Sequence, residues 1–183
     1  MELQQHFKLL ASYNQWINEK VYESACGLSE MEIQKDRGAF FGSILGTLNH
    51  IAVGDTIWLQ RFATLPACRH SLREIAALPG PRSLDQIIYS DIEELRAHRQ
   101  WLDNRIIEWI DGLSEPDFAQ VLNYRTIKGI SGSKRLSNLV LHFFNHQTHH
   151  RGQVSTLLMQ AGKDIGVTDL LALIPDTEDP DHQ

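Results

Sequence analysis

Four histidines occupy a nine-residue stretch near the C-terminal end of the chain, at positions 142, 146, 149 and 150. The stretch reads as part of a long helix, and residues four apart on a helix have Cβ atoms about 5 to 6 Å from each other. His146 and His150 could therefore direct two imidazoles at one metal ion, since neutral imidazole is a common ligand of zinc and related metals. The spacing predicts a metal site on this helix.

The apolar stripe of this helix separates the four histidines. His146 and His150 share the register of Phe143 and Leu157, whereas the other two histidines each precede a stripe residue. We expect the first pair to face the interior and the second pair to lie in solvent on the flank. Two neutral imidazoles buried among apolar side chains are costly unless both find partners, and a shared cation satisfies both. A plain polar network or a pH-sensitive pair is the alternative.

A third ligand must come from another helix, and the segment 41–62 offers two candidates. Periodicity slightly favours Asp55, which lies on the apolar stripe, over His50, which sits to one side of it. The glycines argue for His50, because Gly46 and Gly54 stand one turn before and after it and each costs about 1 kcal/mol relative to alanine in a helix interior. Room for a metal and its substrate is one reason for these glycines, and close helix packing is another. The residues alone leave the choice open.

Two familiar metal-site patterns are missing from the chain. The residues from His146 to His150 have the spacing of the zinc protease signature HExxH, but Gln147 stands where that signature has its general base, and a glutamine does not accept a proton usefully. No glutamate lies three residues before His146 or His150, as the di-iron bundle pattern requires. Protease and di-iron chemistry are therefore disfavoured.

Length and composition indicate one ordinary globular domain. The chain has 183 residues, of which 42% are hydrophobic, and we expect a single domain over 1–183 with a frayed end at 175–183. We expect no secretory signal, no membrane-spanning segment and a cytoplasmic location, which the two cysteines, with no disulfide or CxxC spacing, also fit. A net charge of −6 without a basic run argues against binding to nucleic acid.

Apolar residues recur at steps of three and four over four long segments, which predicts an all-α four-helix bundle. Ser83, followed by Gln86, resembles a capping box at the start of the third segment. Gly162 marks the end of the fourth, since glycine is favoured just past a helix C-terminus. The predicted helices cover residues 3–28, 41–62, 83–112 and 135–162.

The connection between the third and fourth predicted helices is longer than an ordinary bundle loop. A short hairpin in the segment 121–129 would keep it ordered. After the fourth helix, residues 168–174 form a short tail that predicts one or two helical turns packed on the bundle.

Three motifs together resemble the DinB-like superfamily, over nearly the whole chain. They are Tyr13-Asn-Gln-Trp16, then Leu48-Asn-His50 with Asp55 and Trp58, and Asn145-His146-Gln-Thr-His149-His150-Arg-Gly-Gln153. The resemblance implies a four-helix bundle with three histidines around a divalent metal, and it assigns the ligands to His50, His146 and His150. Asp55 then becomes a candidate hydrogen-bond partner for an imidazole, or else a buried polar residue satisfied by the backbone.

Characterised members of the superfamily include S-transferases and an isomerase that use low-molecular-weight thiols. The resemblance therefore implies a metal-dependent thiol S-transferase acting on a small-molecule electrophile, with zinc or nickel favoured over iron, cobalt or copper, and with a homodimer as the assembly. A metal-dependent hydrolase that uses metal-bound hydroxide, and a non-catalytic metal or ligand binder in a stress response, are the alternatives. No general acid or base stands out among the polar candidates, which are Tyr13, Asn14, Asp55, His142, His149 and Arg151. We expect Arg151 to be a surface charge or an interface residue, and not an anion clamp.

Overall fold

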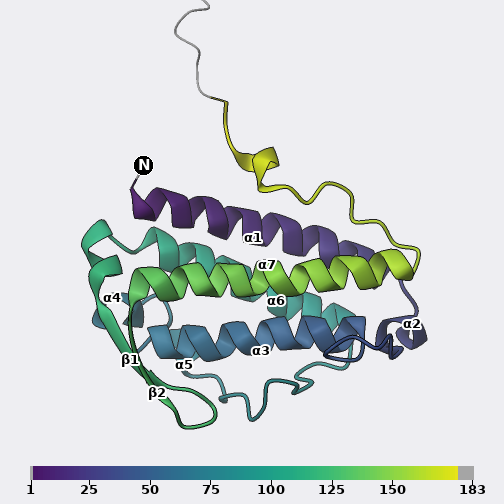
Figure 1. The fold of residues 1–183 in the computed structure, drawn as a ribbon, viewed down its shortest axis with the longest axis horizontal. Helices are drawn as coiled ribbons and strands as arrows, with labels where there is room; N and C mark the ends of the chain where they lie inside the picture. Colours follow the sequence, from purple (N-terminus) through teal and green to yellow (C-terminus); the bar gives the residue numbers. More distant parts are fainter. Residues whose placement is uncertain (1, 177–183) are drawn as a thin grey trace, which may run out of the picture.

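Four long helices form the body of the protein in the computed structural model, which describes residues 2–176 (Figure 1). Helix α1 packs against α6 and α7, and α3 packs against α7. The predicted all-α four-helix bundle is confirmed, with one small two-stranded sheet added. The long helices are α1 (Leu3–Cys26), α3 (Ile44–Phe62), α6 (Ile92–Asp111) and α7 (Leu136–Gln160). The short helices are α2 (Glu30–Gln34), α4 (Pro66–Arg69), α5 (Arg73–Ala76), η1 (Glu115–Ala119) and η2 (Leu170–Leu173).

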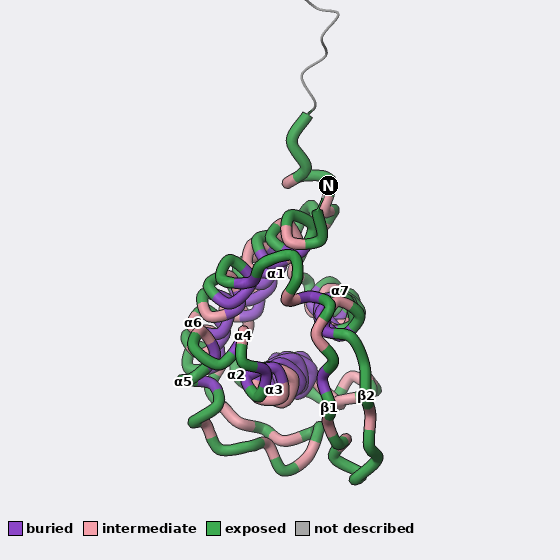
Figure 2. The backbone as a smooth tube through the Cα atoms, turned by 90° about the vertical axis from the view of Figure 1, so that its left-hand side faces the viewer, coloured by how far each residue is buried: buried purple, intermediate pink, exposed green. Residues whose placement is uncertain are grey.

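Helix α3 is the most enclosed element of the bundle. Every residue from Ile44 to Thr56 is buried, and the end-on view shows α3 with burial around most of its circumference (Figure 2). Ser43 caps its first turn by accepting a hydrogen bond from the Gly46 N–H at 3.0 Å, so the helix begins at Ile44 and not at the predicted Phe41. Because α3 is enclosed, each of its polar side chains must find a partner inside the protein.

The predicted start of the third helix is wrong. Residues 83–91 are not helical, and α6 begins only at Ile92, where Asp91 accepts hydrogen bonds from the N–H groups of the first turn. The side chain of Asn49 holds the segment in its non-helical path by accepting hydrogen bonds from the Ile88 and Tyr89 N–H groups at 2.8 and 3.1 Å. It also donates to the Tyr89 carbonyl at 3.0 Å. These bonds from α3 replace the helical ones that the local pattern favoured.

A hairpin is found in the predicted connection, but it extends to Arg135 and not only over 121–129, and the end of the last helix is confirmed. Strands β1 (Val121–Arg125) and β2 (Ser131–Arg135) pair antiparallel, and the hairpin lies beside α3 and α7 (Figures 1 and 2). Gly162 has a φ of +77°, and the Lys163 N–H returns to the Leu158 carbonyl at 2.9 Å, which closes α7. The predicted tail helix is reduced to η2. Of the segment predicted to fray, Pro175 and Asp176 are exposed, and residues 177–183 lie outside the described residues.

A network of charged and amide side chains crosses the buried centre of the bundle. Arg99 of α6 forms ion pairs with Asp55 of α3 and with Asp103, the latter at 2.9 Å. Asp103 accepts from Asn14 of α1 at 2.9 Å, and Asn14 in turn accepts from Arg151 of α7. All five residues are at most 4% exposed, so the expectation of Arg151 as a surface charge is wrong. Each of the four long helices supplies a member of this network.

Among the described residues, no helix combines the length and apolar character needed to cross a membrane.

Arg99→Met should destabilise the protein strongly, because it leaves the carboxylates of Asp55 and Asp103 buried without their cation. A broken buried pair costs about 3 to 5 kcal/mol, to be measured by urea unfolding. Arg96→Met, on the same helix, removes only an exposed pair with Glu93 at 3.6 Å and should cost about 0 to 1 kcal/mol. Equal losses in the two variants would contradict the role given to the network.

Candidate metal centre

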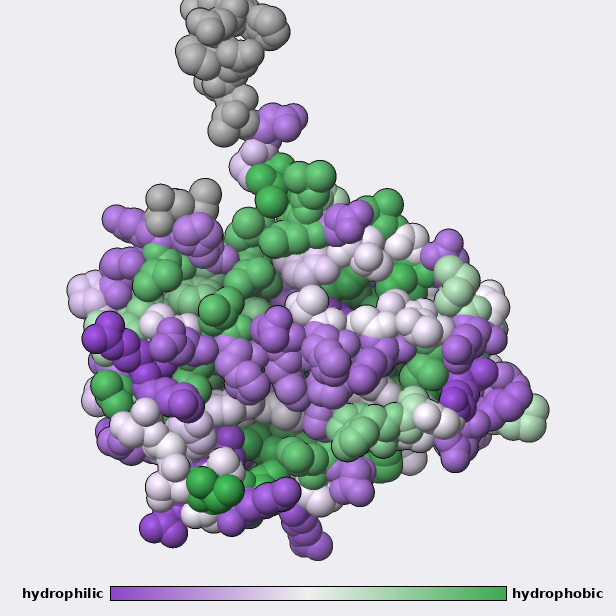
Figure 3. All heavy atoms as spheres, in the orientation of Figure 1, coloured by the Kyte–Doolittle hydropathy of each residue, from purple (hydrophilic) through white to green (hydrophobic). Residues whose placement is uncertain are grey.

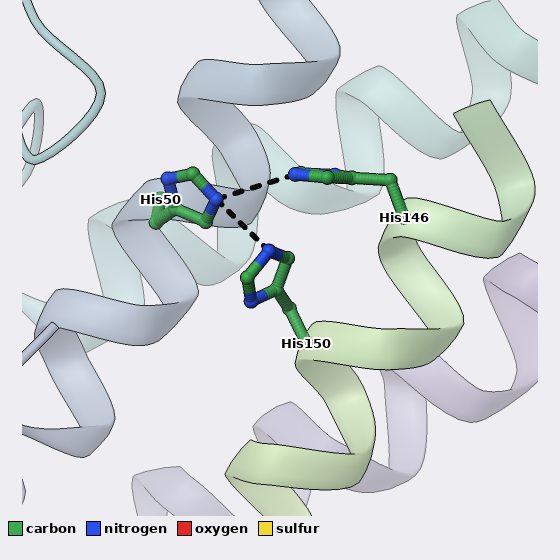
Figure 4. A group of neighbouring side chains, drawn as sticks. All are labelled: His50, His146 and His150. Carbon is green, nitrogen blue, oxygen red and sulfur yellow. Dashed lines mark hydrogen bonds between the residues drawn. The ribbon is translucent and has the colours of Figure 1, made fainter. Parts of the chain in front are cut away.

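Three histidine rings from α3 and α7 point at one another (Figure 4). Nε2 of His50 lies 3.3 Å from Nε2 of His146 and 3.1 Å from Nε2 of His150. A metal–nitrogen bond of about 2.0 to 2.1 Å in a tetrahedral site sets neighbouring nitrogens about 3.3 Å apart. The spacing therefore suits one ion, and these three residues form a group that could hold one.

Hydrogen bonds on the far side of two of the rings fix where their protons lie. Nδ1 of His50 donates to the Leu84 carbonyl at 2.7 Å, and Nδ1 of His150 donates to Oε1 of Gln153 at 2.8 Å. A neutral imidazole carries one N–H, so both Nε2 atoms hold bare lone pairs. Two bare lone pairs at 3.1 Å cannot hydrogen bond to each other, and a cation between them satisfies both.

Burial keeps the three rings neutral. It lowers the pKa of His50 and of His150, and it lowers that of His146 to about 3, with the neighbouring histidines acting in the same direction on His146. Protons therefore do not occupy the facing nitrogens near neutral pH. The neutral form is also the one that binds a metal ion.

Two glycines make room for this arrangement, each in a different way. A Cβ built on Gly54 would lie 2.9 Å from Cε1 of His146, so this glycine gives clearance to a ring of the group itself. A Cβ on Gly46 would lie 2.1 Å from the Phe41 carbonyl oxygen, so here the backbone approaches closely. That approach places the Phe41 ring on His50, with centroids 3.7 Å apart and the planes 16° from parallel. Close packing therefore accounts for both glycines, and room for a metal and its substrate stays a prediction.

Asp55, His142 and His149 do not belong to the group that could hold an ion. Asp55 pairs with Arg99, so neither its expected hydrogen bond to an imidazole nor its alternative, satisfaction by the backbone, is found. His142 and His149 are exposed on α7, as expected. In the view of Figure 1, helix α7 crosses the middle of the molecule, and hydrophilic residues form a band there on the surface (Figure 3).

Sequence reasoning missed the residues that orient the rings. Gln153 follows His150 by one turn, and that spacing was a usable signal. Leu84 acts through its backbone carbonyl, from a segment predicted to be helical, and its side chain carried no signal. Phe41 was placed inside the predicted helix and not on a ring face.

The model of the DinB family matches residues 3–180. The chain belongs to the DinB family. It is 28% identical over 166 residues to Protein DinB of Bacillus subtilis (strain 168), which covers 89% of this chain and 90% of that protein. A crystal structure of a DinB-like protein from Bacillus cereus ATCC 10987 superposes with a TM-score of 0.59 over 82% of this chain and 89% of that one. At 15% identity, the latter shows that the two share the DinB fold.

Gly54→Ala should weaken metal binding by this DinB-family chain, because the added methyl displaces the His146 ring. We expect a loss of roughly 10- to 100-fold in zinc affinity, as when a group that orients a ligand is changed. Competition with a chelating dye measures it. Gly152→Ala, on α7, is the control, since no atom lies within 4 Å of its new Cβ. Unchanged affinity in Gly54→Ala would contradict the role of the glycine.

Proposed function

We propose that this DinB-family chain binds one divalent transition-metal ion through His50, His146 and His150. The observation that carries the proposal is the pair of bare Nε2 atoms of His50 and His150 at 3.1 Å, which no proton can bridge in these tautomers. Imidazole ligands suit several metals, and we favour zinc or nickel over iron, cobalt or copper.

We further propose that the site serves a thiol S-transferase reaction on a small electrophile. Three neutral ligands leave an ion with its full charge and an open position, and an ion of that kind lowers the pKa of a thiol that binds there. The thiol sulfur then forms a bond to an electrophilic carbon, the leaving group departs with its bonding electrons, and the thiol proton passes to solvent. The resemblance to DinB-like S-transferases supports this choice.

Hydrolysis by a metal-bound hydroxide is the second candidate reaction. A hydrolase of this kind benefits from a general base beside the nucleophile. Asp55 is paired with Arg99 and does not serve as that base. The imidazoles of His142 and His149 lie beside the group, with ring centroids 6.1 Å from His146 and 4.8 Å from His150, and are the candidates for this role. We prefer thiol transfer because of the family resemblance.

The residues around the three histidine rings orient two of the rings and shield one side of the group from water. The Leu84 carbonyl and the Gln153 amide hold two imidazoles in the tautomer that presents Nε2. Phe41 covers the face of His50 and contacts His150 edge-on at 5.6 Å, which excludes water on that side.

Protein purified without added metal should contain one ion per chain by elemental analysis. His50→Ala, His146→Ala and His150→Ala should each lose most of it, because each removes a ligand. His70→Ala is the matched control, since this exposed histidine lies outside the group and should keep the metal. Stoichiometric metal in all three ligand variants would refute the proposed site.

The loaded protein should transfer a thiol to 1-chloro-2,4-dinitrobenzene, with release of chloride and a rise in thioether absorbance. Glutathione and bacillithiol are the thiols to compare. Turnover should stop when a chelator removes the metal and return when zinc or nickel is restored. A chain that holds its metal but turns over neither thiol would instead be a non-catalytic binder.

A further inference from the structure

Aromatic side chains continue from the histidine group toward the hairpin. We call Trp58, Tyr124 and His142 the aromatic group. His142 precedes His146 by one turn of α7, with ring centroids 6.1 Å apart, and it meets the Trp58 ring edge-on at 5.2 Å. Trp58 in turn meets Tyr124 of β1 edge-on at 5.2 Å. The rings form a continuous path from the candidate metal centre to the C-terminal half of α3.

The hairpin holds Tyr124 in this position. Tyr124 is paired with Gly132 in the register of β1 and β2. A Cβ built on Gly132 would lie 2.6 Å from Cζ of Tyr124, so the phenol ring lies directly across the glycine of the opposite strand. The lack of a side chain at 132 therefore sets the direction of this ring.

Arg61 of α3 lies over the far end of the aromatic group. Its guanidinium carbon is 4.8 Å from the Trp58 ring centroid and 5.3 Å from that of Tyr124. Such stacking fixes the plane of a guanidinium and leaves its N–H edges free for a planar anion. Within residues 2–176, Arg61 forms no ion pair and donates no side-chain hydrogen bond, although it is only partly exposed.

Other arginines that are at least partly buried are used differently. Arg37 pairs with Glu32 at 2.6 Å, and Arg105 pairs with Glu108 at 2.6 Å. Arg99 is neutralised by two aspartates. The guanidinium of Arg61 thus has a fixed plane, is partly shielded from water and has no carboxylate partner among the described residues. A ligand carboxylate beside it would accept charge-assisted hydrogen bonds.

We propose that Arg61 binds a carboxylate of the substrate whose thiol lies at His50, His146 and His150. This proposal rests on the proposed function. Phe41 covers the opposite side of the histidine group, so an extended substrate runs along His142 and Trp58. The substrate class is a low-molecular-weight thiol with a carboxylate several bonds from its sulfur.

The path sets the length of the thiol. Three successive side-chain contacts, of 6.1, 5.2 and 4.8 Å, separate His146 from the guanidinium, so the sulfur and the carboxylate must lie several bonds apart. In glutathione the thiol is on the central residue and the carboxylates are on the two residues beside it. Glutathione is therefore a suitable probe, whereas in cysteine the thiol and the carboxylate belong to one residue.

The test compares the binding of three probes to the zinc-loaded protein by isothermal titration calorimetry. Glutathione carries the thiol and the carboxylates, its diethyl ester lacks the carboxylates, and S-methylglutathione lacks the free thiol. Arg61→Gln should weaken glutathione binding by about tenfold or more, as loss of a charge-assisted hydrogen bond does, and should leave the ester unchanged. Arg61→Lys should recover part of the loss.

Arg125→Gln is the matched control, because this exposed arginine follows Tyr124 on β1 and should bind all probes as the wild type does. The melting temperature of each variant shows whether it has folded. Equal binding of glutathione and its ester by the wild type, or no effect of Arg61→Gln on folded protein, overturns the proposal. Failure of glutathione to bind at millimolar concentration also counts against it.

The same probes separate this proposal from the proposed function. If S-methylglutathione binds as well as glutathione and both depend on Arg61, the carboxylate site stands while the metal–thiol interaction fails. If glutathione binds far more tightly than its methylated form but Arg61→Gln changes nothing, the metal–thiol interaction stands and the role of Arg61 fails.

Discussion

The buried contact between Arg99 and its two aspartates is the constraint on which the rest of the structure depends. Charges inside a protein must be paired, and removal of one partner leaves the others uncompensated. Asp55 ties α6 to α3, and Asp103 ties α6 to α1 through Asn14, which also accepts from Arg151 of α7. A slide of one turn between any two of these helices would break a buried pair, so the network fixes their register.

That register decides the geometry of the candidate metal centre. Asp55 follows Gly54, the residue against which the His146 ring lies, and Arg151 follows His150 directly. The ion pair at Asp55 and the hydrogen bond from Arg151 to Asn14 therefore hold the two helix segments that carry the histidines at the height where their nitrogens meet. The charged network takes no part in the chemistry of the histidine group, but it determines where the histidines lie relative to one another.

The elements that were predicted well are those whose structure depends on neighbouring residues. The helix predicted over 3–28 is found at Leu3–Cys26, and the one predicted over 135–162 is found at Leu136–Gln160, because an apolar stripe and a terminal glycine act locally. The segment 83–91 was mispredicted because Asn49, some forty residues away, supplies its hydrogen bonds. His146 and His150 followed from helical spacing, whereas His50 required the family resemblance. The pairing of Arg99 with Asp55 joins distant parts of the chain, and periodicity has no means to indicate it.

The hydrogen bond from His50 to the Leu84 carbonyl has a consequence for how such sites vary among proteins. The accepting atom belongs to the backbone, and the Leu84 side chain is 49% exposed. Every amino acid has the same backbone carbonyl oxygen, so residue 84 can be substituted without loss of this hydrogen bond. The number of residues between Ala76, where α5 ends, and Ile88, which donates to Asn49, is constrained. One insertion or deletion there would move the Leu84 carbonyl away from the His50 ring. The orientation of the His50 ring thus depends on the length of this loop. A comparison of the residue types at position 84 among related proteins would not detect that dependence.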